Sequence, residues 1–124
     1  MKLEIKYVKD PGNIENERVV LVVVQPTDIG RYIIADSTYL SNGNVSNLLR
    51  HVFWLPDQLV TVGDFIVVYT KDGNNSSKIN KEGTRSFFFY WGLDKTIWNK
   101  DGDTAVIFEI NDWNMKKLVG SRHI

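Results

Sequence analysis

The stretch from Arg85 to Ile110 constrains the fold more than any other part of the chain. It opens with five consecutive aromatic residues, Phe87 to Trp91, and ends with the apolar run Ala105 to Ile110. Between these runs lies an Asp101-Gly102 step, and two aromatic or β-branched runs joined by an Asp-Gly turn are a strong hairpin signal. We therefore predict a β-hairpin here and take it as the centre of an all-β domain.

Short apolar runs bounded by turn residues recur along the rest of the chain. The alternation of Leu3, Ile5 and Tyr7 with charged residues predicts a half-buried strand with these three side chains on one face. The run Arg18 to Val24 is apolar on both faces and predicts a central strand. Further strands are predicted at 31–36, 50–55, 64–70 and, as an edge strand, 113–119, with a long polar loop at 71–84 and a frayed tail at 120–124. About eight short antiparallel strands without a substantial helix predict a β-sandwich.

Composition limits the classes of function. The 124 residues fit a single domain, and 15 basic residues balance 15 acidic ones, so net charge gives no attraction to nucleic acid or to an anionic membrane. The sequence has no cysteine, which excludes disulfides, thiolate metal ligands and cysteine catalysis. The first residues lack the apolar centre of a signal peptide, and no apolar run is long enough to span a membrane. We expect a cytoplasmic protein that does not bind a membrane.

Few residues suggest chemistry. His51 and His123 are the only histidines, and nothing in the sequence places carboxylates beside them as metal ligands. Asp101 and Asp103 resemble half of a calcium loop, but the glycine and glutamate that such a loop needs are missing, so we interpret them as turn residues. Lysines and acidic residues alternate through the middle of the chain, which argues against a basic patch for nucleic acid. We predict no catalytic residues, no metal and no cofactor.

The aromatic run exceeds what one core needs. In a strand, Phe87, Phe89 and Trp91 point to one face, and Phe88 and Tyr90 point to the other. A two-layer sandwich buries only one face of each sheet, so one set requires another cover, either loops or a partner. We expect Phe88 and Tyr90 to face outward, because a tyrosine hydroxyl tolerates water and a tryptophan suits a core.

The order of these features resembles the lamin-tail domain, an Ig-like β-sandwich. The resemblance covers residues 17 to 112. It rests on an apolar strand after Glu17, a loop holding Tyr39, Phe53-Trp54-Leu55-Pro56, a Gly63-Asp64 turn into Phe65–Tyr69, Trp91-Gly92-Leu93, Ile97-Trp98-Asn99 and Gly102-Asp103. Its departure is Asn111-Asp112-Trp113-Asn114, where the family usually has Asp-x-x-Gly.

The resemblance implies a binding or scaffolding module without an active site of its own. We expect structural roles for Gly63, Trp91, Trp98 and Gly102, with Trp98 in the core and Gly102 at positive φ. The candidate interaction surface is Phe53, Trp54, Phe88 and Tyr90, and the expected partner is another protein or a second copy of the chain. The alternative is a carbohydrate- or surface-binding sandwich. A flat, dry aromatic patch would favour a protein partner, whereas aromatics in a groove beside Asn and Asp would favour a sugar.

Overall fold

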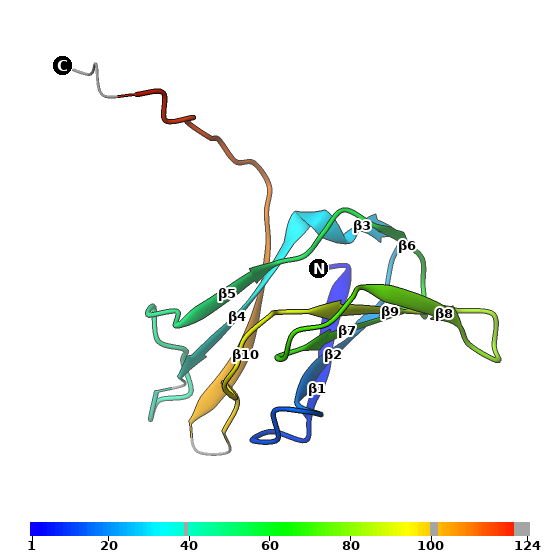
Figure 1. Cartoon of the computed structure of the whole chain (residues 1–124), viewed down its shortest axis with the longest axis horizontal. Coiled ribbons are helices and arrows are strands. Elements are labelled where there is room, and N and C mark those ends of the chain that lie inside the picture. Colours follow the sequence, from blue (N-terminus) through cyan, green and yellow to red (C-terminus); the bar gives the residue numbers. More distant parts are fainter. Residues whose placement is uncertain (39, 100–101, 121–124) are drawn as a thin grey trace.

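β-strands form nearly all of the regular structure in the computed structural model, which describes residues 1–38, 40–99 and 102–120 (Figure 1). A single 3₁₀ turn, η1 (Ile29–Arg31), is the one helical element among these residues. The strands are β1 (Leu3–Lys9), β2 (Arg18–Val23), β3 (Thr27–Asp28), β4 (Tyr32–Thr38), β5 (His51–Trp54), β6 (Leu59–Val60), β7 (Phe65–Tyr69), β8 (Ser76–Ile79), β9 (Arg85–Tyr90) and β10 (Asp103–Glu109). The predicted all-β fold without a substantial helix is confirmed.

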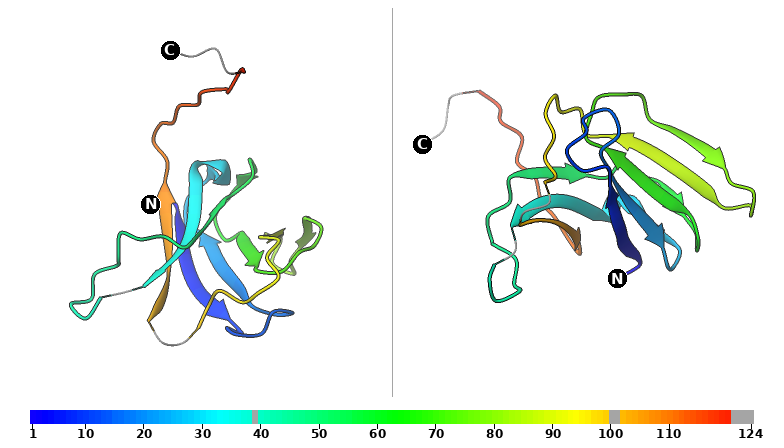
Figure 2. Two further views of the ribbon diagram at one scale, coloured as in Figure 1. Left: turned by 60° about the vertical axis from the view of Figure 1, so that its left-hand side comes forward. Right: turned by 90° about the horizontal axis from the view of Figure 1, so that it is seen from below.

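The strands form two main sheets around a shared interior (Figure 2). One sheet has five strands in the order β1-β2-β7-β9-β8, and the other has three in the order β10-β4-β5, while β3 and β6 make a short ladder of their own. β2 lies inside the larger sheet and is flanked on both sides, as its apolar sequence predicted. The core between the sheets is lined by alternate residues of β1, β2, β4, β7 and β9: Leu3, Val19, Leu21, Val23, Tyr32, Ile34, Ile66, Val68, Phe87 and Phe89.

Not every strand pair is antiparallel. β7 and β9 run parallel, with Phe65 opposite Ser86 and Tyr69 opposite Tyr90. The expectation of antiparallel strands throughout was therefore wrong at this pair. Parallel neighbours need a connection that returns along the sheet, and here the return carries β8, which pairs antiparallel with β9 at the edge.

The predicted hairpin between the aromatic run and the last apolar strand does not form. β9 belongs to the five-stranded sheet, whereas β10 pairs with β4 in the other sheet. The chain leaves β9 at Trp91 and crosses between the sheets, burying Ile97 and Trp98 on the way. The Asp-Gly signal failed because the segment before it holds two apolar side chains that are stable only in the core.

Two further assignments were wrong. Residues 71–84 are not one long loop, because they contain β8, whose four residues are all exposed. An edge strand outside the core needs only backbone pairing, so its polar sequence gave no strand signal. Residues 113–119, predicted as an edge strand, form no strand, and the segment extends away from both sheets (Figures 1 and 2).

A β-bulge in β1 reverses one expected side-chain direction. The register with β2 shifts between Ile5 and Tyr7, so Val8 rather than Tyr7 continues the inward alternation. Tyr7 instead faces away from the core and is 49% exposed. An extra residue in one strand changes the parity of everything that follows it, and the sequence alone did not reveal this one.

Two expectations about single residues, the burial of Trp98 and the positive φ of Gly102, are confirmed. Trp98 is buried in the core, and Gly102 has φ +87°, which a side chain with a Cβ rarely adopts. Gly63 also has positive φ and precedes β7, and Trp91 packs against the core from a half-buried position. Tyr39, Asp101 and His123 lie outside the described residues, as does 121–124 of the predicted frayed tail.

Candidate functional site

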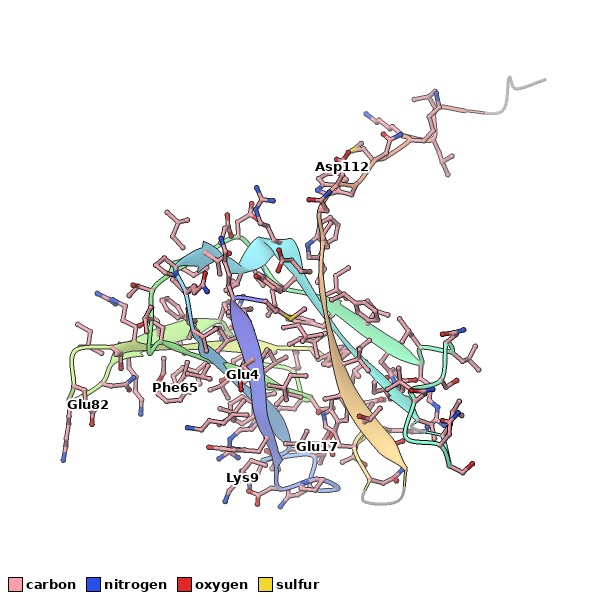
Figure 3. The ribbon with its side chains drawn as sticks, turned by 180° about the vertical axis from the view of Figure 1, so that it is seen from behind. Glu4, Lys9, Glu17, Phe65, Glu82 and Asp112 are labelled. Atoms are coloured by element: carbon pink, nitrogen blue, oxygen red, sulfur yellow. The ribbon has the colours of Figure 1, made fainter. Side chains whose placement is uncertain are left out.

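The face of the five-stranded sheet that points away from the core carries an unusual number of aromatic side chains. We call it the outer face. Residues of β1, β2, β7 and β9 contribute to it at alternate positions, and its aromatic members are Tyr7, Phe65, Tyr69, Phe88 and Tyr90. Figure 3 shows Phe65 between Glu4 of β1 and Glu82 in the turn after β8. Val20 and Val67 lie between the rings as a nearly solvent-free floor.

The outer face is hollowed into an open groove of about 700 Å³. Its floor is formed by the two valines, and its walls by four of the five rings, all except Tyr90. The turn after β8 closes one side with Asn80, Lys81 and Glu82. The volume is within the range of pockets that bind ligands or partner side chains. Strand β8 at the sheet edge therefore gives the groove a wall that a flat sheet would lack.

Basic side chains of the protein lie over these rings. Nζ of Lys6 is 5.5 Å from the ring centroid of Phe65, and Nζ of Lys78 is 5.9 Å from that of Phe88. Tyr69 has Arg18 at 5.5 Å and Lys71 at 5.4 Å, and stacks on Tyr90 with an interplanar angle of 10°. A cation over a ring face is attracted by the ring quadrupole. The outer face thus combines aromatic rings with positively charged side chains.

The structure divides the four residues of the predicted interaction surface between two sheets. Phe88 and Tyr90 lie on the outer face, both half-buried. Phe53 faces the core side of β5 and packs on Trp91, with ring centroids 5.4 Å apart. Trp54 points the opposite way. The four side chains therefore do not make one surface, because adjacent residues of a strand alternate in direction and β5 is not in the sheet of β9.

Three aromatic residues of the outer face were missed from the sequence. Tyr7 was assigned inward because the bulge was not foreseen. Phe65 and Tyr69 belong to the strand predicted at 64–70, whose continuous apolar sequence gives no side-chain direction. No local signal gives their direction, because it depends on the pairing of β7 with β2 and β9, which are far apart in the sequence.

A buried carboxylate holds the segment that crosses between the sheets. Glu17 has 0% exposure, and its Oε2 accepts hydrogen bonds from Thr70 Oγ1 (2.6 Å) and Ile97 N (3.1 Å). Its Oε1 accepts from Gly12 N (2.8 Å) and from Trp98 N at a longer 3.4 Å. Buried polar groups need such partners. Glu17 is satisfied by groups of its own chain and therefore acts as a structural residue.

A second surface with aromatic side chains lies where the C-terminal segment leaves β10. Trp54 and Trp113 meet edge to face, with centroids 5.4 Å apart, and the indole N–H of Trp54 donates to the carbonyl of Gly30 (2.7 Å). Trp113 is 59% exposed and borders a groove of about 360 Å³. The polar side chains of that groove are Asp28, Arg31, Asp57, Asn111 and Asp112, and Figure 3 labels Asp112 at the start of the segment.

Asp36 and Tyr32 are two further buried titratable groups with partners inside the fold. Asp36 is buried and accepts from the backbone N–H of His51 (2.6 Å), with Nδ1 of the same histidine at 3.1 Å. Burial raises the pKa of the Tyr32 phenol, whose hydroxyl donates to Glu109 at 3.2 Å. Within the described ranges, no three His, Cys, Asp or Glu side chains are grouped as a metal site would require.

Comparison with known proteins gives no relative for this chain: no family model, curated protein or solved structure matches it. The resemblance to lamin-tail domains therefore remains a prediction from the quoted motifs. Across the residues that the structure describes, no helix has the length and apolar character needed to cross a bilayer.

Proposed function

We propose that this protein is a non-catalytic interaction module of lamin-tail type that binds another protein through the outer face of its five-stranded sheet. The observation that carries the proposal is the groove on that face, where aromatic rings surround a floor of two valines. Aromatic side chains grouped on one accessible face are enriched at interaction sites. A cytoplasmic location is part of the proposal and is supported by the absence of cysteine from the sequence.

The aromatic side chains give this surface enough area to hold a partner. Large aromatic residues each bury about 150–250 Å² when fully covered, and a few such anchors dominate the binding energy of an interface. Tyr7 is the most exposed of them, and Phe88 lies half-buried on the groove wall. Tyr90 offers less surface to a partner, because its ring stacks on Tyr69 and is covered by the backbone of Gly73. That glycine lies so close that a Cβ added to it would come within 2.5 Å of the ring.

The non-catalytic part of the proposal is supported by what the buried acidic groups do. Glu17 accepts from backbone N–H groups and a threonine hydroxyl, and Asp64 accepts from Arg85 N and Thr61 N, each at 2.9 Å. These carboxylates fix turns and the segment between the sheets. Lamin-tail domains, which the chain resembles, are likewise modules without an active site.

The test replaces Tyr7 and Phe88 by serine and compares pull-downs from host-cell extract, together with sedimentation of the purified protein. We expect the Tyr7→Ser, Phe88→Ser double variant to lose the partner or the self-association that the unmodified protein shows. The control is Trp113→Ser, Leu118→Ser, which removes two exposed apolar side chains elsewhere. If the first variant is folded by circular dichroism and recovers the same partners in the same association state, the proposal is wrong.

Carbohydrate binding is a second candidate, and the groove beside Trp113 favours it. There an exposed indole lies beside Asn111 and several Asp side chains, an arrangement expected of a sugar-binding groove. The test is tryptophan fluorescence during titration with neutral oligosaccharides, comparing the unmodified protein with Trp113→Ala. A saturable change that disappears in the variant would support this candidate, and no change in either protein would exclude it for the sugars used.

A further inference from the structure

The positive charge on the outer face identifies the class of partner more closely. Among the side chains that line the groove, Arg18, Lys78 and Lys81 are basic and only Glu82 is acidic. Arg18 has an ion-pair partner in Asp10 at 3.6 Å, but no ion pair is found for Lys78 or Lys81 within the described part of the chain. The protein as a whole is neutral, so this excess is local. It favours an occupant with negative charge.

The arrangement of cations over the rings argues against nucleic acid. Bases bind single-strand sites by stacking on open aromatic faces. On Tyr69, Tyr90 stacks against the ring and two cations lie near it, while Lys6 and Lys78 lie over Phe65 and Phe88. A base would have to displace these side chains. Carboxylates of a polypeptide could instead pair with the ammonium and guanidinium groups where they are.

A second copy of the chain is also a poor occupant for a face-to-face contact. A two-fold dimer through this face would bring the same surface of each copy together. Both surfaces would then carry the same basic excess, with only Glu82 of each groove lining to neutralise it. Like charges held across an interface oppose association.

The edge of the sheet provides the backbone part of a binding site. β8 is the last strand in the order and pairs with β9 on one side only. Its other side presents backbone N–H and C=O groups, and all four of its residues are exposed. Lys78 and Ser76 lie opposite outer-face residues of β9, so a strand added beside β8 would place alternate side chains next to Lys78.

We propose that an extended acidic segment of a partner protein binds as an additional strand along β8, with alternate Asp or Glu side chains pairing with Lys78 and Lys81 at the mouth of the aromatic groove. This inference rests on the proposed function and specifies its partner. Strand addition to a sheet edge supplies main-chain hydrogen bonds, and the side-chain contacts supply specificity. A lysine on the edge disfavours pairing with neutral or basic strands and therefore contributes to the selection.

The test uses fluorescein-labelled peptides of about twelve residues and fluorescence anisotropy at low and at physiological salt. One peptide alternates glutamate with valine, a second alternates glutamate with proline, a third alternates lysine with valine, and the fourth probe is a single-stranded oligothymidine of the same length. We expect only the glutamate–valine peptide to bind strongly. The glutamate–proline peptide has equal charge but lacks half of the backbone donors, so it separates strand addition from simple charge attraction.

Matched variants locate the site. Lys78→Glu, Lys81→Glu should weaken binding of the glutamate–valine peptide at least about tenfold. Lys116→Glu, Lys117→Glu makes the same change of net charge in the exposed C-terminal segment and should alter affinity less than about twofold. Amide hydrogen exchange of residues 76–79 should slow when the peptide is bound, because these amides lie in or beside the new ladder. Unfolding midpoints of both variants verify that they are folded.

Three results would overturn the inference. They are equal loss in the two charge variants, equal binding of the valine and proline peptides, and tighter binding of the oligothymidine than of any peptide. Absence of peptide binding, with partner recovery still lost in Tyr7→Ser, Phe88→Ser, would overturn the acidic segment and leave the proposed function intact. Unchanged recovery in that aromatic variant would instead contradict the proposed function, whatever the peptides do.

Discussion

Replacement of Glu17 by alanine should destabilise the protein more than any surface substitution. The change leaves three buried donors without their acceptor, namely Thr70 Oγ1, Ile97 N and Trp98 N, and a fourth, Gly12 N, that is partly buried. A buried donor left unpaired costs about 1–3 kcal/mol. The bond from Trp98 is long, and water can reach Gly12, so the bonds from Thr70 Oγ1 and Ile97 N matter most. We expect the free energy of unfolding to fall by about 3–5 kcal/mol.

Two further variants make this prediction specific. Glu17→Gln keeps one acceptor oxygen but turns an NH₂ group toward at least one backbone N–H in either amide orientation, so we expect about 1–3 kcal/mol. Glu15→Ala removes a carboxylate that is exposed and makes only a 3.5 Å contact with Lys71, and should change stability by less than about 0.5 kcal/mol. The measurement is chemical denaturation followed by tryptophan fluorescence. A loss below about 1 kcal/mol for Glu17→Ala would refute the reasoning.

Three more expectations concern single residues. Trp98→Ala should lower the free energy of unfolding by about 3–5 kcal/mol in chemical denaturation. Trp98→Phe should lower it much less, because the indole N–H that it removes is buried without a partner among the described residues. Equal losses in the two variants would contradict this. Gly102→Val should destabilise by about 1–2 kcal/mol and Gly102→Ala by less, since φ is +87°; an unchanged midpoint would contradict the strain. Burial raises the pKa of Tyr32, so its neutral phenol contributes to the stability of the folded state. This contribution is complete below the unfolded-state pKa of about 10 and is lost as the pH rises through the folded-state pKa. Tyr32→Phe should remove this pH dependence of stability, as measured by denaturation between neutral and alkaline pH.

The sequence was sufficient where local pattern and tertiary packing agree. The all-β class, the central β2 strand, the buried Trp98 and the positive φ of Gly102 all follow from apolar runs and turn residues. The same signals failed where a distant contact decides the outcome. The Asp-Gly step predicted a hairpin, but burial of Ile97 and Trp98, together with their bonds to Glu17, directs the chain into the other sheet.

The candidate surface was predicted only in part for a related reason. Alternation within the aromatic run put Phe88 and Tyr90 on one face, and the expectation that this face is the outer one came from the chemistry of tyrosine and tryptophan side chains. The other members of the surface depend on pairings between strands far apart in sequence and on the bulge that turns Tyr7 outward. No local pattern encodes either. Assigning Trp54 to the same surface failed because sheet membership is a property of topology.

The parallel pairing of β7 with β9 restricts how the segment between them can vary during evolution. A chain leaving the end of β7 must return to the start of β9 over the length of a five-residue strand, about 17 Å. Deletions within 71–79 would therefore shorten a span that the topology requires. For folding alone, most substitutions there should be accepted, because the side chains of β8 are exposed and only its backbone is paired. The exceptions are proline within the ladder and any side chain at Gly73, whose Cβ would come within 2.5 Å of the Tyr90 ring. Added residues are best tolerated at the turn 80–83, beyond the ladder. In relatives of this chain, the segment should keep its minimum length even where its exposed side chains, Gly73 and Lys78 apart, vary.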